Sequence, residues 1–268
     1  MPLKRVLTGA LLIGFVLAVL LWAPTWLFFL ALLPFGWLAL WEYLELVART
    51  GSAPPRWPVY VVGAGVWAVA AWFPAQLMPA IIGGALLLFM SALGRRQGAA
   101  GFLPASAAAA FALLYIGVPF AFLLDLFGWY WRGHLVVLYL LLLVWVGDTA
   151  AYFVGRALGR NKLAPVLSPG KTVEGTAASL VATVAVGYWL LPKWFGVGAA
   201  HALLLPIIVN VAAQAGDLAE SALKRSAGVK DSSTLLPGHG GMLDRIDSLL
   251  FAAPALWYYW KFVIRGGF

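Results

Sequence analysis

The chain has 268 residues, of which 63% are hydrophobic and only 10% are charged, and its formal net charge is +8. Since a soluble domain has roughly 25% charged residues, this sequence has too few polar side chains to cover a water-soluble globule, and its composition predicts an integral membrane protein. The absence of cysteine excludes disulfides, thiolate metal sites and a cysteine nucleophile. The basic excess is typical of cytoplasmic loops and of contacts with anionic lipid headgroups, so we expect no nucleic-acid partner.

Apolar segments suited to crossing a bilayer, which takes about 20 residues each, recur along the chain. The first follows a basic start, as in a signal peptide, but its apolar run is long and no A-x-A-like cleavage site follows it. We therefore interpret it as an uncleaved first helix. The pattern predicts an all-α, polytopic membrane protein with about nine transmembrane helices, at roughly 6–22, 26–44, 59–72, 77–93, 102–124, 135–153, 177–191, 199–215 and 249–264.

The distribution of Lys and Arg orients these helices. With the N-terminus in the cytoplasm, fourteen basic residues fall on the inner side and four on the outer side. This asymmetry is what the positive-inside rule expects of a multi-pass protein of the inner (cytoplasmic) membrane. Two polar inner loops, 154–176 and 216–248, stand out by their length. We expect them to form a site that faces the cytoplasm.

The first polar loop follows Asp148, which lies in an apolar run where a carboxylate is costly and usually faces a polar interior. Its core, SPGKTVEG, joins a Ser168-Pro169-Gly170 turn to Lys171 and Thr172 just before a predicted helix. Backbone N–H groups, a hydroxyl and an ammonium at such a position can hold phosphate oxygens. The spacing of a Walker A motif is missing, and an ordinary basic loop before a capped helix is an equally open interpretation.

The second polar loop has a carboxylate group at each end. Near its start, Asp217 shares a helix face with Glu220 or Ser221 and with Lys224, because these residues are three to four positions apart. Near its end, Asp244 and Asp247 are again three apart. Few, solvent-accessible carboxylates suit Mg²⁺ that substrate phosphates also hold. Surface salt bridges are the alternative, although Asp217 and Asp244 lie next to the membrane spans rather than out in the loop.

The remaining polar residues give weaker signals. His239 lies in a Pro-Gly-His-Gly-Gly turn, where it serves either as a general base or metal ligand or, at least as readily, as a loop-forming residue. His134 and His201 fall on the predicted outer side and are interpreted as incidental. The histidines form no pattern typical of a zinc site, and no G-x-S-x-G motif supports a serine hydrolase.

The polar C-terminal segment resembles the signature of the phosphatidate cytidylyltransferases, also called CDP-diacylglycerol synthases. The family pattern runs S-x-x-K-R, K-D, P-x-H-G-G and D-R-x-D. It is matched here by Ser221, Lys224, Arg225, Lys230, Asp231, Pro237, His239, Gly240, Gly241, Asp244, Arg245 and Asp247. The segments GDTAAY, SPGKTVEG and GDLAES are similar to the family's flanking segments, and YIGVP at 115–119 is similar to its mid-chain motif. One departure is Gly170, where a second basic residue is common.

This resemblance implies an enzyme of phospholipid biosynthesis that transfers the cytidylyl group of CTP to phosphatidate, giving CDP-diacylglycerol and pyrophosphate. It also implies a homodimer in the lipid bilayer that depends on Mg²⁺ and allows a second cation such as K⁺. The implied metal ligands are Asp217, Asp244 and Asp247. The implied catalytic residues are Lys171, Lys224, Arg225, Asp217 and Asp244. The expected substrate-binding residues are Ser168, Thr172, Glu174, Ser221, Lys230, His239 and Arg245.

Two other functions stay open at this point. A CTP-dependent polyisoprenoid (dolichol-type) lipid kinase is also polytopic, but the long signature argues against it. An ion-coupled transporter would use Asp148 and Asp217 as coupling carboxylates, but such sites usually lie near the bilayer midplane rather than in loops. The whole chain is expected to form one membrane-embedded cytidylyltransferase domain, 1–268, with N-terminal helices in 1–130 and the catalytic part in 131–268.

Overall fold

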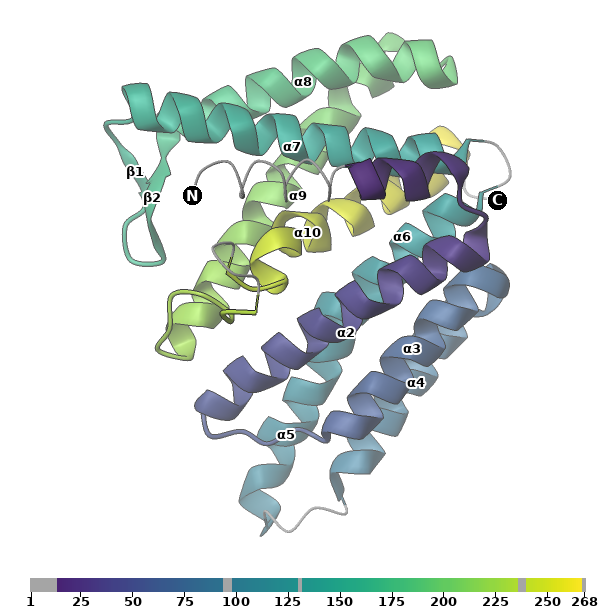
Figure 1. The fold of residues 1–268 in the computed structure, drawn as a ribbon, viewed down its shortest axis with the longest axis vertical. Coiled ribbons are helices and arrows are strands. Elements are labelled where there is room, and N and C mark those ends of the chain that lie inside the picture. The colour runs from purple at the N-terminus through teal and green to yellow at the C-terminus, as the bar shows by residue number, and fades with distance from the viewer. Residues whose placement is uncertain (1–13, 94–97, 130–131, 236–239, 267–268) are drawn as a thin grey trace. The chain divides into compact units, whose positions relative to one another are not determined.

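The computed structural model describes residues 14–93, 98–129, 132–235 and 240–266, and they are predominantly helical (Figure 1). Within these ranges, six helices are long and apolar enough to cross a membrane. This confirms the prediction of an all-α membrane protein, with one small β-hairpin added. The count of nine is not confirmed: α3 and α10 have only 17 residues each, and the first predicted helix, 6–22, lies partly outside the described residues.

The chain divides into two compact units, each assembled from two separate stretches of sequence. Unit 1 comprises Met1–Leu135 and Ala227–Asp244, and unit 2 comprises Val136–Ser226 and Arg245–Phe268. The signature segment after α9 thus returns to the N-terminal helices, which a division at residue 130 does not anticipate. The assignment of the whole chain to one domain stays a prediction.

Unit 1 contains most of the helices before residue 135. They are α2 (Thr25–Arg49), α3 (Arg56–Trp72), the 3₁₀ turn η1 (Pro74–Gln76), α4 (Leu77–Leu93), α5 (Gly98–Ala112), the π-helical turn η2 (Leu113–Gly117) and α6 (Val118–Gly128). Helix α2 contacts α3, α5 and α6. Pro24 and Pro55 precede α2 and α3 in extended conformation, since proline stops a preceding helix and has no N–H to leave unpaired.

Trp67 of α3 anchors the core of unit 1. Its ring is buried, and its Nε1 donates a hydrogen bond of 2.8 Å to the carbonyl oxygen of Gly117, in the π-helical turn of the YIGVP segment. A Cβ on Gly36 would lie 2.4 Å from the Trp67 ring, so α2 can pack on this ring only with glycine there. The YIGVP motif therefore contains the end of a π-helical turn that is held in place by the hydrogen bond from Trp67.

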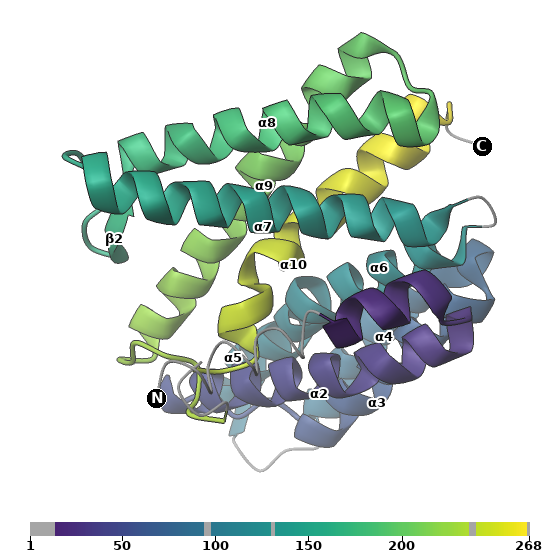
Figure 2. The ribbon, with the colours of Figure 1, turned by 45° about the horizontal axis from the view of Figure 1, so that its top comes forward.

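Unit 2 contains the remaining elements. They are α7 (Gly133–Leu158), β1 (Lys162–Ala164), β2 (Ser168–Thr172), α8 (Val173–Phe195), α9 (Ala199–Ser226), α10 (Leu243–Tyr259) and the π-helical turn η3 (Trp260–Ile264). The first residues of α7 and α10 are assigned to unit 1. Strands β1 and β2 pair antiparallel, and Figures 1 and 2 show α7 and α8 side by side. Helix α8 also packs against α9.

Small and polar side chains join α7, α8 and α9. Asn210 of α9 donates to Ser179 Oγ at 2.8 Å and to Thr183 Oγ1 at 3.0 Å, both on α8, and it accepts from Gln214 at 2.6 Å. Gly147 of α7 faces these groups, because a Cβ there would lie within 3.0 Å of Ser179 Oγ, Thr183 Oγ1 and Asn210 Nδ2. Buried polar groups in a membrane helix bundle are satisfied between helices in this manner.

The two predicted polar loops are shorter than the sequence suggests. Helix α7 continues to Leu158, α9 continues to Ser226, and α10 already begins at Leu243. The expected loop 154–176 contains a β-hairpin, and much of 216–248 is helical. Hydropathy marks where apolar side chains stop, but an α-helix satisfies its own backbone hydrogen bonds and can extend beyond that point.

Candidate active site

A cavity of about 700 Å³ lies in unit 2, lined by α7, the hairpin, the start of α8 and α9. Of the residues predicted from the sequence, it brings together Ser168, Lys171, Thr172 and Asp217, together with Asp148. Small-molecule sites commonly have volumes of 300–1,000 Å³. The cavity can therefore accommodate a ligand that is much larger than a single phosphate.

An ion pair between Lys171 and Asp217 lies in this cavity. Lys171 Nζ is 2.6 Å from Asp217 Oδ2, and the two side chains are only 21% and 32% exposed. Lys171 comes from β2 and Asp217 from α9, so the hairpin delivers the ammonium to a carboxylate that lies 46 positions further along the chain. A phosphate that enters the cavity meets a cation that is already positioned there.

Asp247 extends this acidic group. Burial is the largest cause that raises the pKa of Asp247 to about 7, and the Asp217 and Asp148 carboxylates act in the same direction. The Ser248 N–H and Lys224 partly oppose this rise. Helices α9 and α10 approach closely at this level, since a Cβ on Gly216 would lie 2.5 Å from the Asp247 carbonyl oxygen. Asp217, the next residue, is thereby held near Asp247.

The carboxylates near the cavity offer the hard oxygen ligands that Mg²⁺ prefers. In the part of the chain that the structure describes, no three His, Cys, Asp or Glu side chains are grouped closely enough to hold a metal ion by themselves. Mg²⁺ usually keeps several waters and is bound by one or two carboxylates plus substrate phosphates. The hard oxygens of Asp217 and Asp247, which interact electrostatically, have the chemistry that such a site needs. The predicted metal-binding roles stay predictions.

The hairpin and the start of α8 use several predicted substrate-binding groups internally. Thr172 caps α8, because its Oγ1 accepts a hydrogen bond of 3.1 Å from the Gly175 N–H. The Glu174 carboxylate accepts bonds of 3.1–3.3 Å from the backbone N–H groups of Arg160 and Asn161, and one of 2.9 Å from the Asn161 side chain. These bonds hold the residues just before β1 against the first turn of α8. Direct substrate contacts of Thr172 and Glu174 stay predictions.

The end of α9 carries the first part of the signature. Lys224 pairs with the fully buried Glu220 one turn earlier, at 2.5 Å, and Ser221 is buried beside them. Arg225 is exposed, and its Nε donates to the Leu167 carbonyl oxygen of the hairpin at 3.3 Å. Arg225 therefore links α9 to the same hairpin that carries Lys171.

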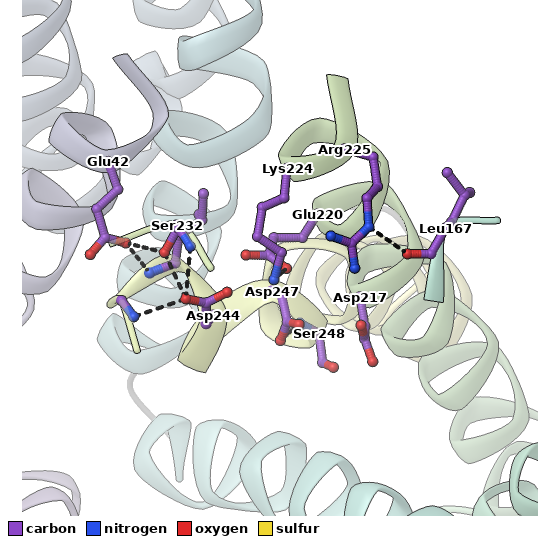
Figure 3. A network of polar contacts seen from close by, with 12 residues as sticks. Glu42, Leu167, Asp217, Glu220, Lys224, Arg225, Ser232, Asp244, Asp247 and Ser248 are labelled. Carbon is purple, nitrogen blue, oxygen red and sulfur yellow. Dashed lines mark hydrogen bonds and ion pairs between the residues drawn. The ribbon is translucent and has the colours of Figure 1, made fainter. Parts of the chain in front are cut away.

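The middle of the signature, from Ala227 to Asp244, lies in unit 1. Asp244, in the first turn of α10, accepts hydrogen bonds on Oδ2 from Ser232 N at 3.1 Å and Gly241 N at 2.8 Å, and the same oxygen lies 2.8 Å from Ser232 Oγ (Figure 3). Lys230 is exposed in the same segment, and Arg245, the first residue of the second stretch of unit 2, is also exposed. His239 lies outside the described residues.

Several residues of these sites were not selected from the sequence. Arg156, Lys162, Tyr152 and Gln214 also line the cavity, but the two basic residues were considered only as markers of the inner side. Glu42 of α2 is fully buried and bonded to the signature segment of unit 1. A carboxylate in an apolar run, the signal that singled out Asp148, is equally present at Glu42.

Sequence comparisons match this chain to known proteins. The profile of the cytidylyltransferase family matches residues 3–263. A phosphatidate cytidylyltransferase of Bacillus subtilis is 43% identical over 148 residues, which are 55% of this chain and 55% of the relative. One of Staphylococcus saprophyticus is 42% identical over 152 residues (55% of this chain, 57% of the relative), and one of Haemophilus influenzae is 42% identical over 139 residues (50% and 48%).

The chain spans about half the length of the curated relatives that it matches. The family profile, by contrast, extends over nearly all of its residues, from residue 3 into the π-helical turn after α10. The chain belongs to the cytidylyltransferase family.

Proposed function

We propose that this protein transfers the cytidylyl group of CTP to phosphatidate, giving CDP-diacylglycerol and pyrophosphate. The observation that carries the proposal is the cavity of unit 2, in which Lys171 and Asp217 form an ion pair beside further basic and acidic side chains. Family membership and the names of the relatives support it. A lipid substrate agrees with the six helices in the described part of the chain that are able to cross a membrane.

The chemistry requires little covalent participation from the protein. A phosphate oxygen of phosphatidate attacks the α-phosphorus of CTP, a new P–O bond forms, and the bond between the α-phosphorus and the bridging oxygen breaks. The electron pair leaves with pyrophosphate. Positioning and electrostatic stabilisation dominate reactions of this type, so no serine or cysteine nucleophile is needed.

The chain's own residues would divide this work. Lys171, Lys224 and Arg225 would bind phosphate oxygens, with Ser168 and Thr172 supplying hydroxyl groups. Lys171 would move from Asp217 towards a bound phosphate, since its flexible side chain already reaches into the cavity. Arg156 and Lys162 would add positive charge at the cavity wall.

Asp217, Asp244 and Asp247 would hold Mg²⁺, and a second cation such as K⁺ is part of the proposal. A bound Mg²⁺ would supply charge neutralisation on the transferred and departing phosphates. We further propose that the enzyme is a homodimer of the inner membrane and that both signature segments face the cytoplasm, where CTP is available.

The direct test is product analysis. Purified protein is incubated with CTP, phosphatidate and Mg²⁺, and both products are identified. CDP-diacylglycerol with pyrophosphate is the expected result. Phosphorylated lipid with CDP would instead indicate a lipid kinase, and no CTP-dependent product would refute the proposed activity.

The proposed orientation has its own test. Because the chain contains no cysteine, single cysteines at the exposed positions 165 and 235 can be labelled in intact cells with a membrane-impermeant reagent. We expect both to react only after the cytoplasmic side is opened. Labelling of both from the outer side alone would contradict the orientation.

A further inference from the structure

Glu42 is an acidic side chain in the apolar helix α2 and is 0% exposed. An isolated buried carboxylate is strongly unfavourable unless hydrogen bonds compensate its charge. Here four donors do so, and all of them come from residues 232–243, some 190 to 201 positions away in sequence. Helix α2 and the signature segment are therefore joined at one carboxylate (Figure 3).

The four bonds are divided evenly between the two carboxylate oxygens. Oε1 accepts from Ser233 Oγ at 2.6 Å and from Met242 N at 2.8 Å. Oε2 accepts from Ser232 Oγ at 2.9 Å and from Leu243 N at 2.6 Å. The two backbone N–H groups lie at the start of α10, where unpaired N–H groups give a helix its partial positive charge. Glu42 thus acts as a distant cap for α10.

Ser232 connects this cap to Asp244. Its Oγ lies 2.9 Å from Glu42 Oε2 and 2.8 Å from Asp244 Oδ2, while its backbone N–H donates to the same Asp244 oxygen at 3.1 Å. A hydroxyl has one hydrogen and donates it to one carboxylate at a time. The position of Asp244 therefore depends on where Glu42 holds Ser232.

Gly241 shows how tightly this arrangement is packed. A Cβ at this position would lie 1.9 Å from Ser232 Oγ and 2.6 Å from Glu42 Oε1, so no other residue fits without displacing them. Gly241 also donates its N–H to Asp244 at 2.8 Å. The second glycine of the Gly-Gly pair in the signature is thus explained by the close approach of Ser232 and of Glu42, which lies outside the signature.

We propose that Glu42 is a positioning residue of the reaction: through Ser232 and the start of α10, it holds Asp244 in its working position. The kinetic part of this inference rests on the proposed function, whereas the anchoring of the segment does not. Glu42 itself touches neither substrate nor metal in this assignment. It acts only through the segment 232–244.

Glutamine cannot replace Glu42 in this role. Each carboxylate oxygen accepts from a backbone N–H, and a backbone N–H cannot rotate to become an acceptor. The amide NH₂ of glutamine would face one of these N–H groups in either of its two orientations, which leaves a donor opposite a donor. Glu45, one turn further along α2, is 37% exposed and pairs with Arg56 at the surface. Glu45→Gln is therefore a matched control.

The anchoring is tested without any activity measurement. In the cysteine-free chain, Met242→Cys places a single thiol at a position that is 7% exposed, and its rate of modification by a water-soluble reagent reports opening of the segment. We expect Glu42→Gln to raise this rate by about tenfold or more, the factor for one lost charge-assisted hydrogen bond. Glu45→Gln should leave it unchanged. Equal rates in all three backgrounds, well below the melting temperature, would overturn the anchoring.

The positioning is tested by kcat at saturating CTP and phosphatidate. Ser232→Ala and Ser233→Ala each remove one hydroxyl bond to Glu42, but only Ser232 also contacts Asp244. We expect Glu42→Gln and Ser232→Ala to lower kcat by about tenfold or more, and Ser233→Ala clearly less. Equal effects of the two serine variants would show a merely structural role and refute positioning.

If Glu42→Gln fails to fold, the comparison of Ser232→Ala with Ser233→Ala still tests the positioning role. If the unmodified protein makes no CDP-diacylglycerol, the proposed function fails and positioning for that reaction is refuted with it. The thiol experiment still decides whether Glu42 anchors the segment, because it needs no turnover.

Discussion

Replacement of Lys171 by methionine tests the central ion pair of the cavity. Methionine keeps much of the bulk of the lysine side chain but removes its charge. In the structure, Lys171 Nζ lies 2.6 Å from Asp217 Oδ2, and neither side chain is more than a third exposed. The variant therefore loses a partly shielded, charge-assisted hydrogen bond and also leaves the Asp217 carboxylate without its cation.

Two effects of this substitution weaken the binding of a triphosphate substrate. One phosphate contact disappears, and the negative charge of Asp217, beside Asp148 in the same cavity wall, is no longer offset by Lys171. A hydrogen bond to a charged group contributes about 1.5–3 kcal/mol. This corresponds to a fall in kcat/KM for CTP of roughly 10- to 150-fold.

The assay is the initial rate of CDP-diacylglycerol formation over a range of CTP concentrations. Lys193→Met is the matched control: Lys193 lies in the last turn of α8, with its ammonium 3.8 Å from the centre of the Trp189 ring, and does not line the cavity. Its effect should stay within about 0.5 kcal/mol. Lys171→Arg, which keeps the charge, should recover part of the activity. If Lys171→Met behaved like Lys193→Met, the phosphate-binding role of Lys171 would be refuted.

Three further predictions concern the carboxylates, the histidine and helix packing. Asp217→Asn and Asp244→Asn should each lose most activity, because they remove a charge that would bind the metal. Both should keep a near-normal melting temperature, because the side-chain volume hardly changes. Near-normal turnover at limiting Mg²⁺ would refute metal binding by that residue. His239→Asn should keep partial activity, since phosphatidate needs no general base. The pH–rate profile should stay unchanged around the usual histidine pKa of ~6.5. A variant that folds and binds CTP but is inactive would instead show that the histidine is catalytic. Gly147→Ala should lower stability by about 1–3 kcal/mol, because the new methyl group would lie under 3.0 Å from two hydroxyls of α8. Gly83→Ala, with nothing within 4 Å, is the control in thermal unfolding, and equal melting temperatures would contradict the packing argument.

The sequence predicted the features that depend on composition and on short-range pattern. Few charges and long apolar runs identify a membrane protein because the bilayer cannot solvate exposed polar groups. The signature segment singled out Asp244 and Asp247 as candidate metal ligands, and the GDLAES segment just before it singled out Asp217. Helix ends were less accurate, because α7 and α9 extend past the apolar residues that marked them.

The partners of the predicted residues could not be deduced in this way. The contact of Thr172 with a phosphate stays a prediction, and the structure adds that its Oγ1 caps α8. Lys171 was expected to meet substrate, and without substrate it pairs with Asp217. In both cases the residue type is compatible with two uses, and only the local geometry shows which groups lie within bonding distance.

By itself, then, the sequence determined the membrane character of this protein and its family signature, because both are encoded in residue type and short spacing. Only the tertiary structure decided that Glu42 in α2 receives four hydrogen bonds from residues 232–243. It also decided that a hairpin carries Lys171 to Asp217 on α9. Such contacts depend on how helices pack across some 46 to 201 positions, and this packing is set by the shapes of many side chains together, such as glycines at 147, 216 and 241, which no local pattern specifies.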